Sequence, residues 1–220
     1  MKARNTLTAA LILASALPGA VQAALHDRGG GFIYDDALDV TWLQDANYAK
    51  TSGHDAGGLM TWQDAMAWVA GLSVYDAVRN TTYDDWRLPV SDFCFNYSGC
   101  VDSEMGHLYY IDLGGVAHVD LATTHNDNYL LFQNIQNPFD AGHWSSTVAS
   151  TYPSLTVWAF DMDNGIQSKN GASSDAYLYA WAVRDGDVAA IPEPETYAMM
   201  LAGLGLVAFA AGRRNHLKAR

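Results

Sequence analysis

The 220-residue sequence predicts an α+β domain with short strands, few helices and long loops, followed by a C-terminal transmembrane helix. Three observations support this fold class. Apolar segments are short and are separated by Gly, Asp and Asn, which is typical of many short strands joined by irregular connections. Only residues 61–72 show clear helical spacing of apolar side chains within the domain, and residues 197–212 form an uncharged segment after it.

The first element is a secretory signal peptide, predicted over residues 1–23. Lys2 and Arg4 precede an apolar run, and Ala23 ends a segment with the small residues that a signal peptidase recognises. We expect cleavage between Ala23 and Ala24. The alternative is a retained membrane anchor, which the short apolar core disfavours because a full span takes about 20 residues.

Two strands, over residues 32–34 and 40–43, are predicted to open the domain as a pair. A helix follows, because Thr61 can cap it and apolar residues then recur at helical spacing. Ser91 is predicted to cap a second short helix. Residues 129–135 fit either a helix or a strand.

The end of the domain is predicted to be β-structure. Residues 155–160 and 166–169 flank Asn164 and Gly165, a dipeptide that supplies the positive φ angles of a tight hairpin turn. Residues 177–183 alternate large and small side chains, and we expect them to form the closing strand.

The uncharged segment 197–212 is predicted to be the transmembrane helix. Sixteen helical residues reach about 24 Å, slightly less than the hydrocarbon core of about 30 Å. Arg213 and Arg214 follow it, and the positive-inside rule keeps them cytoplasmic. The predicted organisation is therefore a signal peptide at 1–23, an extracellular domain at 24–190 and a C-terminal signal at 191–220.

Charge excludes one class of partner. Residues 24–191 hold six basic residues against 21 Asp and one Glu, a formal net charge of −16. Such a domain repels phosphate backbones, so we expect no nucleic-acid binding.

The C-terminal segment resembles the PEP-CTERM sorting signal. Pro192, Glu193 and Pro194 precede a short Gly/Ala/Leu-rich helix, and Arg213 and Arg214 begin the basic tail. The resemblance implies recognition by exosortase after a transient inner-membrane stage. It also implies a final place at the cell surface, outer membrane or extracellular matrix of a Gram-negative bacterium that makes exopolysaccharide. The alternative is an ordinary C-terminal membrane anchor.

The domain resembles the C-terminal domain of collagen-like adhesins, the Lcl C-terminal-like domains, over roughly residues 31–185. Two motifs that the resemblance rests on contain the residues Trp86, Arg87, Leu88, Pro89, Trp144, Ser145 and Ser146. The resemblance implies a compact C-type-lectin-like or formylglycine-generating-enzyme-like fold in a non-enzymatic surface module. Some relatives bind sulfated glycans, which a net charge of −16 disfavours here.

The motif residues are expected to be structural. Arg87 is one of six bases in an acidic domain, and we expect it to be buried against a carboxylate such as Asp85 or Asp92. Trp144 is expected to point inward. Exposed hydroxyls of Ser145 and Ser146 are the alternative, although no catalytic triad context accompanies them.

Cys94 and Cys100 are the only cysteines of an exported chain, so a local disulfide is expected. The alternative is a thiol- or copper-dependent site of an oxidase-like enzyme. No other cofactor is expected except calcium, whose weak candidate ligands are Asp161 and Asp163 at the start of a calcium-loop-like segment.

A second metal hypothesis joins four further residues of a polar stretch: His118, Asp120, His125 and Asp127. Their spacing matches no zinc helix.

The sequence therefore predicts a non-enzymatic surface or matrix protein that binds glycan or matrix components in exopolysaccharide or biofilm. Its expected partners are signal peptidase and exosortase during export, and then extracellular polysaccharide or surface proteins. The alternative is a structural surface protein without a glycan ligand.

Overall fold

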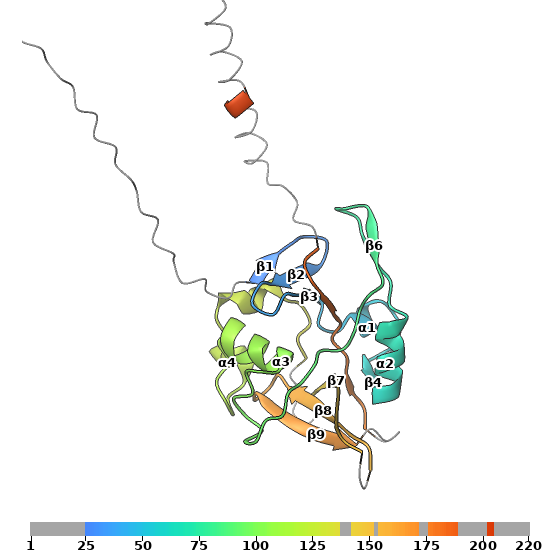
Figure 1. Ribbon diagram of the computed structural model, residues 1–220, viewed down its shortest axis with the longest axis vertical. Helices are drawn as coiled ribbons and strands as arrows, with labels where there is room; N and C mark the ends of the chain where they lie inside the picture. The colour runs from blue at the N-terminus through green and yellow to red at the C-terminus, as the bar shows by residue number, and fades with distance from the viewer. Residues whose placement is uncertain (1–24, 137–141, 152–153, 172–175, 189–201, 205–220) are drawn as a thin grey trace, which may run out of the picture.

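Two β-sheets form the frame of the molecule (Figure 1). The structure, a computed structural model, describes residues 25–136, 142–151, 154–171, 176–188 and 202–204. The described part is mostly β-structure, which confirms the predicted short strands and few helices, whereas the predicted α+β, lectin-like fold is not confirmed. The predicted signal cleavage site and nearly all of the C-terminal signal lie outside the described residues.

The first sheet is antiparallel and has the order β1-β2-β3-β11. Its strands are β1 (Leu25–Asp27), β2 (Phe32–Asp35), β3 (Val40–Leu43) and β11 (Val183–Asp185). The predicted opening pair of strands is confirmed as β2 and β3, which place Ile33 opposite Trp42. Trp42 also lies opposite Val183, so the two ends of the domain meet in this sheet.

The second sheet has the order β4-β10-β7-β8-β9, in which β10 pairs with β7 in parallel. Its strands are β4 (Leu59–Met60), β7 (His143–Ser150), β8 (Thr156–Asp161), β9 (Ile166–Gly171) and β10 (Leu178–Tyr179). A separate hairpin joins β5 (Val74–Asp76) to β6 (Thr81–Tyr83).

Two β predictions need correction in detail. The β8–β9 hairpin exists, but Asp161 pairs with Ile166, so the connection has four residues and only Gly165 of the Asn164-Gly165 pair has a positive φ. The predicted closing strand is divided between the two sheets as β10 and β11. Trp181 lies between them, and its indole Nε1 donates to the carbonyl of Leu43 at 2.7 Å.

The predicted first helix is confirmed as α2 (Trp62–Ala70). The hydroxyl of Thr61 accepts a hydrogen bond from the backbone N–H of Asp64, which caps the helix. The other helical segments are short: α1 (Tyr48–Thr51), α3 (Glu104–His107), the π-helix η1 (Leu108–Asp112), α4 (Leu121–Thr124) and the 3₁₀-helix η2 (Asp127–Leu131).

The helix predicted at Ser91 is wrong. The backbone N–H of Ser91 donates to the hydroxyl of Thr147, and the backbone N–H of Val90 donates to the carboxylate of Glu104. These side chains from other parts of the chain take the place of hydrogen-bond partners within a helix. The ambiguous segment 129–135 ends the 3₁₀-helix η2 and then forms a bridge between Gln133 and Asp45.

Aromatic side chains fill the core. Trp42, Trp144 and Trp181 are fully buried, and the rings of Trp42 and Trp181 meet edge to face at 5.3 Å. The segment around Trp181 thereby joins the core side of both sheets.

Among the described residues, none of the helices has the length and apolar character needed to cross a membrane. Of the predicted transmembrane segment 197–212, only residues 202–204 are described, and they are helical.

Candidate functional site

The residues of the Trp86-Arg87-Leu88-Pro89 motif lie against β11. Trp86 and Leu88 are buried, and the backbone of Arg87 exchanges two hydrogen bonds with Val183. The motif is therefore attached to the outer side of β11 by a single antiparallel bridge.

The carboxylate partner of Arg87 differs from the expectation. Its guanidinium contacts Glu104 at 2.7 and 2.8 Å and Asp185 at 2.6 Å, instead of Asp85 or Asp92. Asp85 is occupied by Arg184 at 2.7 Å. Glu104 is brought beneath Arg87 because its backbone N–H donates to the carbonyl of Val90.

The Trp144-Ser145-Ser146 motif faces inward. Trp144 and Ser145 are fully buried, and the Ser145 hydroxyl accepts from the N–H of Thr147. Ser146 donates its backbone N–H to the carbonyl of Pro89 at 2.9 Å. These contacts pack the Trp144-Ser145-Ser146 motif against the Trp86-Arg87-Leu88-Pro89 motif.

The predicted disulfide between Cys94 and Cys100 is present. It closes the centre of a segment that we call the disulfide loop, residues 92–103. The loop carries three exposed aromatic side chains: Phe93 is 69% exposed, Phe95 82% and Tyr97 46%.

The disulfide loop is attached to the second sheet. Gln167 on β9 is fully buried, donates its backbone N–H to the carbonyl of Tyr97 and donates its side-chain amide to the carbonyl of Asp92, both at 2.7 Å. Phe93 and Tyr97 contact Trp158 on β8, and the ammonium of Lys169 lies 5.0 Å from the Trp158 ring.

Residues of the disulfide loop also line a hollow of about 220 Å³, with Asp92, Asn96 and Asp102 among its polar groups. The loop therefore combines exposed rings, hydrogen-bonding groups and a fixed backbone at one surface. Sequence analysis identified the disulfide but did not identify these exposed aromatic residues.

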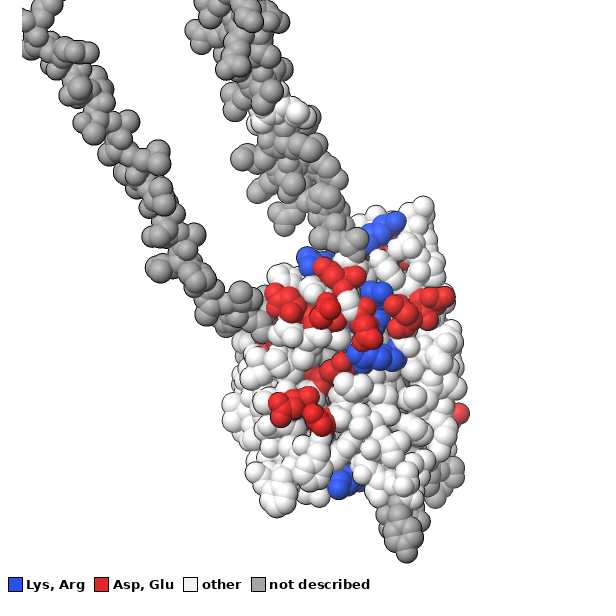
Figure 2. All heavy atoms as spheres, viewed as in Figure 1, with Lys and Arg blue, Asp and Glu red and all other residues white. Residues whose placement is uncertain are grey.

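Charged side chains gather on one face of the molecule, where basic groups lie among acidic ones (Figure 2). Each arginine of the described residues is paired with a carboxylate: Arg28 with Asp187, Arg79 with Asp76, Arg87 with Glu104 and Asp185, and Arg184 with Asp85. These pairs leave little positive charge for a polyanionic ligand.

The sequence-predicted calcium ligands Asp161 and Asp163 belong to a turn. One carboxylate oxygen of Asp161 accepts from the N–H of Asp163 and the other from the side-chain amide of Asn164. Asn164 in turn accepts from the N–H of Ile166. The local role of Asp161 is therefore to hold the β8–β9 connection.

Two residues of the second metal hypothesis, Asp120 and His125, also make contacts with near neighbours in the chain. The Asp120 carboxylate caps α4 by accepting from the N–H of Ala122, and the ring of His125 stacks on Tyr129 at 4.2 Å.

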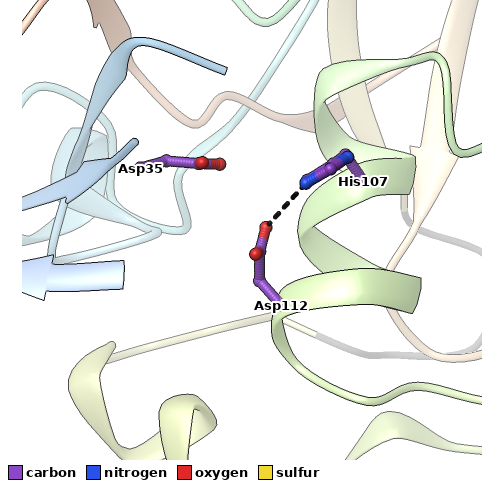
Figure 3. Close-up of side chains that lie close together, drawn as sticks. All are labelled: Asp35, His107 and Asp112. Atoms are coloured by element: carbon purple, nitrogen blue, oxygen red, sulfur yellow. Dashed lines mark ion pairs between the residues drawn. The ribbon is translucent and has the colours of Figure 1, made fainter. Parts of the chain in front are cut away.

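Three other residues form a group that could hold a metal ion: Asp35, His107 and Asp112 (Figure 3). One ligand atom from each lies within 4.8 Å of the other two. Asp35 ends β2, His107 ends α3 and Asp112 ends η1. Nε2 of His107 lies 3.7 Å from Oδ2 of Asp112.

Burial dominates the electrostatics of this group. Asp35 is fully buried and Asp112 is 3% exposed. Burial and the nearby charge of Asp35 raise the pKa of Asp112 to about 8, and burial also raises the pKa of Asp35. Sequence analysis did not identify this group, because Asp35 is distant in the chain from the other two residues and the spacing of His107 and Asp112 matches no metal-binding motif.

Comparison with known proteins identifies the C-terminal segment. The model of the PEP-CTERM protein-sorting motif matches residues 190–215. The chain carries a PEP-CTERM sorting motif. The motif implies exosortase-dependent export to the surface of a Gram-negative cell, with exosortase as the processing partner.

The matched segment contains all the predicted sorting residues, Pro192, Glu193, Pro194, Arg213 and Arg214. No curated protein and no solved structure matches the chain. The resemblance of the domain to Lcl C-terminal-like domains therefore finds no support in these comparisons.

Proposed function

We propose that this chain is a non-enzymatic surface or matrix protein that binds glycan of the surrounding exopolysaccharide through its disulfide loop. The PEP-CTERM motif supports the location, because it implies export to the surface. The observation that carries the binding function is the exposure of three aromatic side chains on the disulfide loop: Phe95 and Tyr97 within the ring closed by the disulfide and Phe93 directly before it.

The large exposed fractions of these aromatic side chains support a role for the loop as an interaction surface. A ring that is 82% exposed, as in Phe95, gains little from folding and is available to a ligand. Aromatic rings stack on the apolar faces of sugar rings, while Asp92, Asn96 and Asp102 offer hydrogen bonds to hydroxyl groups.

Preorganisation also supports this proposal. The disulfide and the two hydrogen bonds from Gln167 hold the loop in place before a ligand arrives. Binding to such a loop loses less conformational entropy than binding to a flexible segment.

Charge favours a neutral or weakly acidic polymer over a sulfated one. The domain has a formal net charge of −16, and Lys169 is a base that contacts Phe93 of the loop and Trp158 on β8. For an acidic polymer, calcium could bridge polymer carboxylates to Asp92 and Asp102. Calcium is thus an optional component of the proposed binding mode.

Co-sedimentation tests the proposal. The exported chain is mixed with polysaccharide extracted from the producing bacterium, first with calcium and then with chelator. We expect binding by the wild type and at least a tenfold weaker binding by Phe95→Ala, since loss of one stacking ring removes about 1.4 kcal/mol or more.

Tyr75→Ala is the matched control. Tyr75 is 59% exposed on the β5–β6 hairpin, which lies at the opposite end of the molecule from β9 (Figure 1). Equal binding by both variants would contradict a role for the disulfide loop. Absence of binding under both conditions would leave the alternative of a structural surface protein without this glycan ligand.

The remaining alternative is a thiol- or copper-dependent oxidase. Such chemistry requires a free thiolate, and both Cys94 and Cys100 are in the disulfide. Thiol titration of the exported chain checks this point, and two reactive thiols would revive the enzyme hypothesis.

A further inference from the structure

We propose that Asp35, His107 and Asp112 bind one divalent transition-metal ion, best matched by Zn²⁺, which joins β2 to the α3–η1 segment. This site is separate from the disulfide loop and does not depend on glycan binding. It also differs from the calcium ligands that the sequence predicted.

The first argument is the lack of partners for buried polar atoms. Both carboxylate oxygens of Asp112, Oδ2 of Asp35 and Nε2 of His107 are buried and have no hydrogen-bond partner among the described residues. Two carboxylates this close are unfavourable in a low-dielectric interior unless a cation or a proton compensates them. A bound cation would satisfy all three side chains together.

The second argument is geometry. Four ligands placed tetrahedrally around Zn²⁺ at about 2.1 Å lie about 3.4 Å from one another. The distance of 3.7 Å between Nε2 of His107 and Oδ2 of Asp112 is close to this value. The whole group lies within 4.8 Å, so small side-chain rotations bring all three atoms to one ion.

The third argument is the type of ligand. Calcium and magnesium take six or more oxygen ligands, whereas imidazole nitrogen suits zinc and its neighbours in the first transition row. Three protein ligands leave one tetrahedral position for water. The side chain of His107 is 18% exposed, so the imidazole lies near the surface while its Nε2 is buried.

The backbone around the group supports a fixed site. One oxygen of Asp35, Oδ1, accepts from the N–H groups of Ala37 and Leu38, which leaves Oδ2 for the ion. The carbonyl of Asp112 accepts from the side-chain amides of Asn126 and Asn128, each at 2.9 Å. These contacts orient both ligands from outside the site.

The π-helix places the other two ligands together. In an α-helix, residues five apart point about 140° away from each other. The η1 turn instead closes through a hydrogen bond from the N–H of Leu113 to the carbonyl of Leu108. This i to i+5 closure brings His107 and Asp112 to one face, and π-turns of this kind occur often at functional sites.

Metal content and thermal unfolding test the proposal. The exported full chain, purified in mild detergent and stripped with chelator, is given Zn²⁺ and then measured by mass spectrometry for metal per chain. We expect one zinc ion per chain and a rise in Tm of about 5–10 °C at a zinc concentration 100-fold above Kd.

Zinc should reverse the order of the unfolding temperatures of the wild type and the variant Asp112→Asn. Without metal it should unfold at the wild-type temperature or above, because it removes one of two adjacent buried carboxylates. With zinc it should unfold below the wild type, because it has lost a ligand. Asp163→Asn, which makes the same change of charge in the β8–β9 turn, should keep the full zinc response.

Three results would overturn the proposal: substoichiometric zinc in the wild type, an unchanged zinc response in Asp112→Asn, or a response to Ca²⁺ and not to Zn²⁺. If the compensating particle is a shared proton, the wild type shows no zinc response. Substitution with Co²⁺ provides a readout that needs no variant, since a tetrahedral site gives intense visible absorption bands.

Discussion

Arg87 and Glu104 face each other through two hydrogen bonds, from Nη1 to Oε2 at 2.8 Å and from Nη2 to Oε1 at 2.7 Å. Glu104 is the single glutamate between residues 24 and 191. Its Oε2 also accepts from the backbone N–H of Val90 at 2.8 Å. One carboxylate therefore connects Arg87 of the β11-paired segment, Val90 just before the disulfide loop, and α3.

Glu104→Ala should destabilise the protein by about 2–4 kcal/mol, because it leaves the N–H of Val90 and two guanidinium donors without their acceptor. Urea unfolding measures the change. Asp85→Ala is the control, since the Asp85 side chain is 54% exposed and its pair with Arg184 should contribute less than about 1 kcal/mol. Similar losses in both variants would refute the special role of Glu104.

Removal of the disulfide by Cys94→Ser with Cys100→Ser should lower the free energy of unfolding by about 2 kcal/mol, as expected for a short closed loop. The same change should weaken polysaccharide binding, because the loop loses its preorganisation. Urea unfolding and co-sedimentation measure the two effects. Unchanged binding by the double variant would show that the contacts of Gln167 suffice to position the aromatic residues.

His143 should make stability depend on pH. It is fully buried between the rings of Tyr179 and Trp181, and burial lowers its pKa to about 4 from the ordinary 6.5. The folded state therefore favours the neutral ring. This stabilisation is complete above about pH 6.5 and is lost as the pH falls from 6.5 towards 4.

The variant His143→Phe isolates this effect. Between pH 7 and pH 4 its free energy of unfolding should fall by about 3 kcal/mol less than that of the wild type, because carboxylates titrate in both proteins. Chemical unfolding across this pH range provides the comparison. Parallel curves for the two proteins would mean that His143 has the same pKa in the folded and unfolded states, which would contradict the lowered pKa.

Gly106 should not tolerate a side chain. It lies within α3, where alanine is ordinarily favoured, but a Cβ atom there would overlap the carbonyl oxygen of Cys100. Gly106→Ala should therefore destabilise the protein by about 1–3 kcal/mol. Gly71→Ala, whose Cβ would meet no atom closer than 3.5 Å, is the matched control for thermal unfolding and should be nearly neutral.

The parts of the fold that the sequence predicts well depend on contacts between near neighbours. Thr61 caps α2 through Asp64, three residues away, and Gly165 permits the turn between β8 and β9. The closing strand was wrong in its extent because its division depends on Trp181 reaching Leu43 on a distant strand. No pattern within residues 177–183 reports that contact.

The candidate sites divide in the same way. The cysteine pair was predictable from its short spacing and exported context, whereas exposure of Phe93 and Phe95 depends on how β8 and β9 support the loop. The group of Asp35, His107 and Asp112 depends on a π-turn and on the position of β2. The local sequence pattern instead predicted Asp161 as a calcium ligand, and its carboxylate accepts hydrogen bonds within the β8–β9 turn.

The ion pair between Arg28 and Asp187, at 2.6 Å, lies where the described domain begins and ends. A pulling force applied at Val188 would act first on this Arg28–Asp187 pair and then on β11. Because β11 is held laterally by β3 and by the Arg87 and Arg184 pairs, that load is shared among several parallel attachments. The ion pairs beside β11 thus attach the last strand of the domain to its neighbours at several points, next to the segment that leads to the sorting motif.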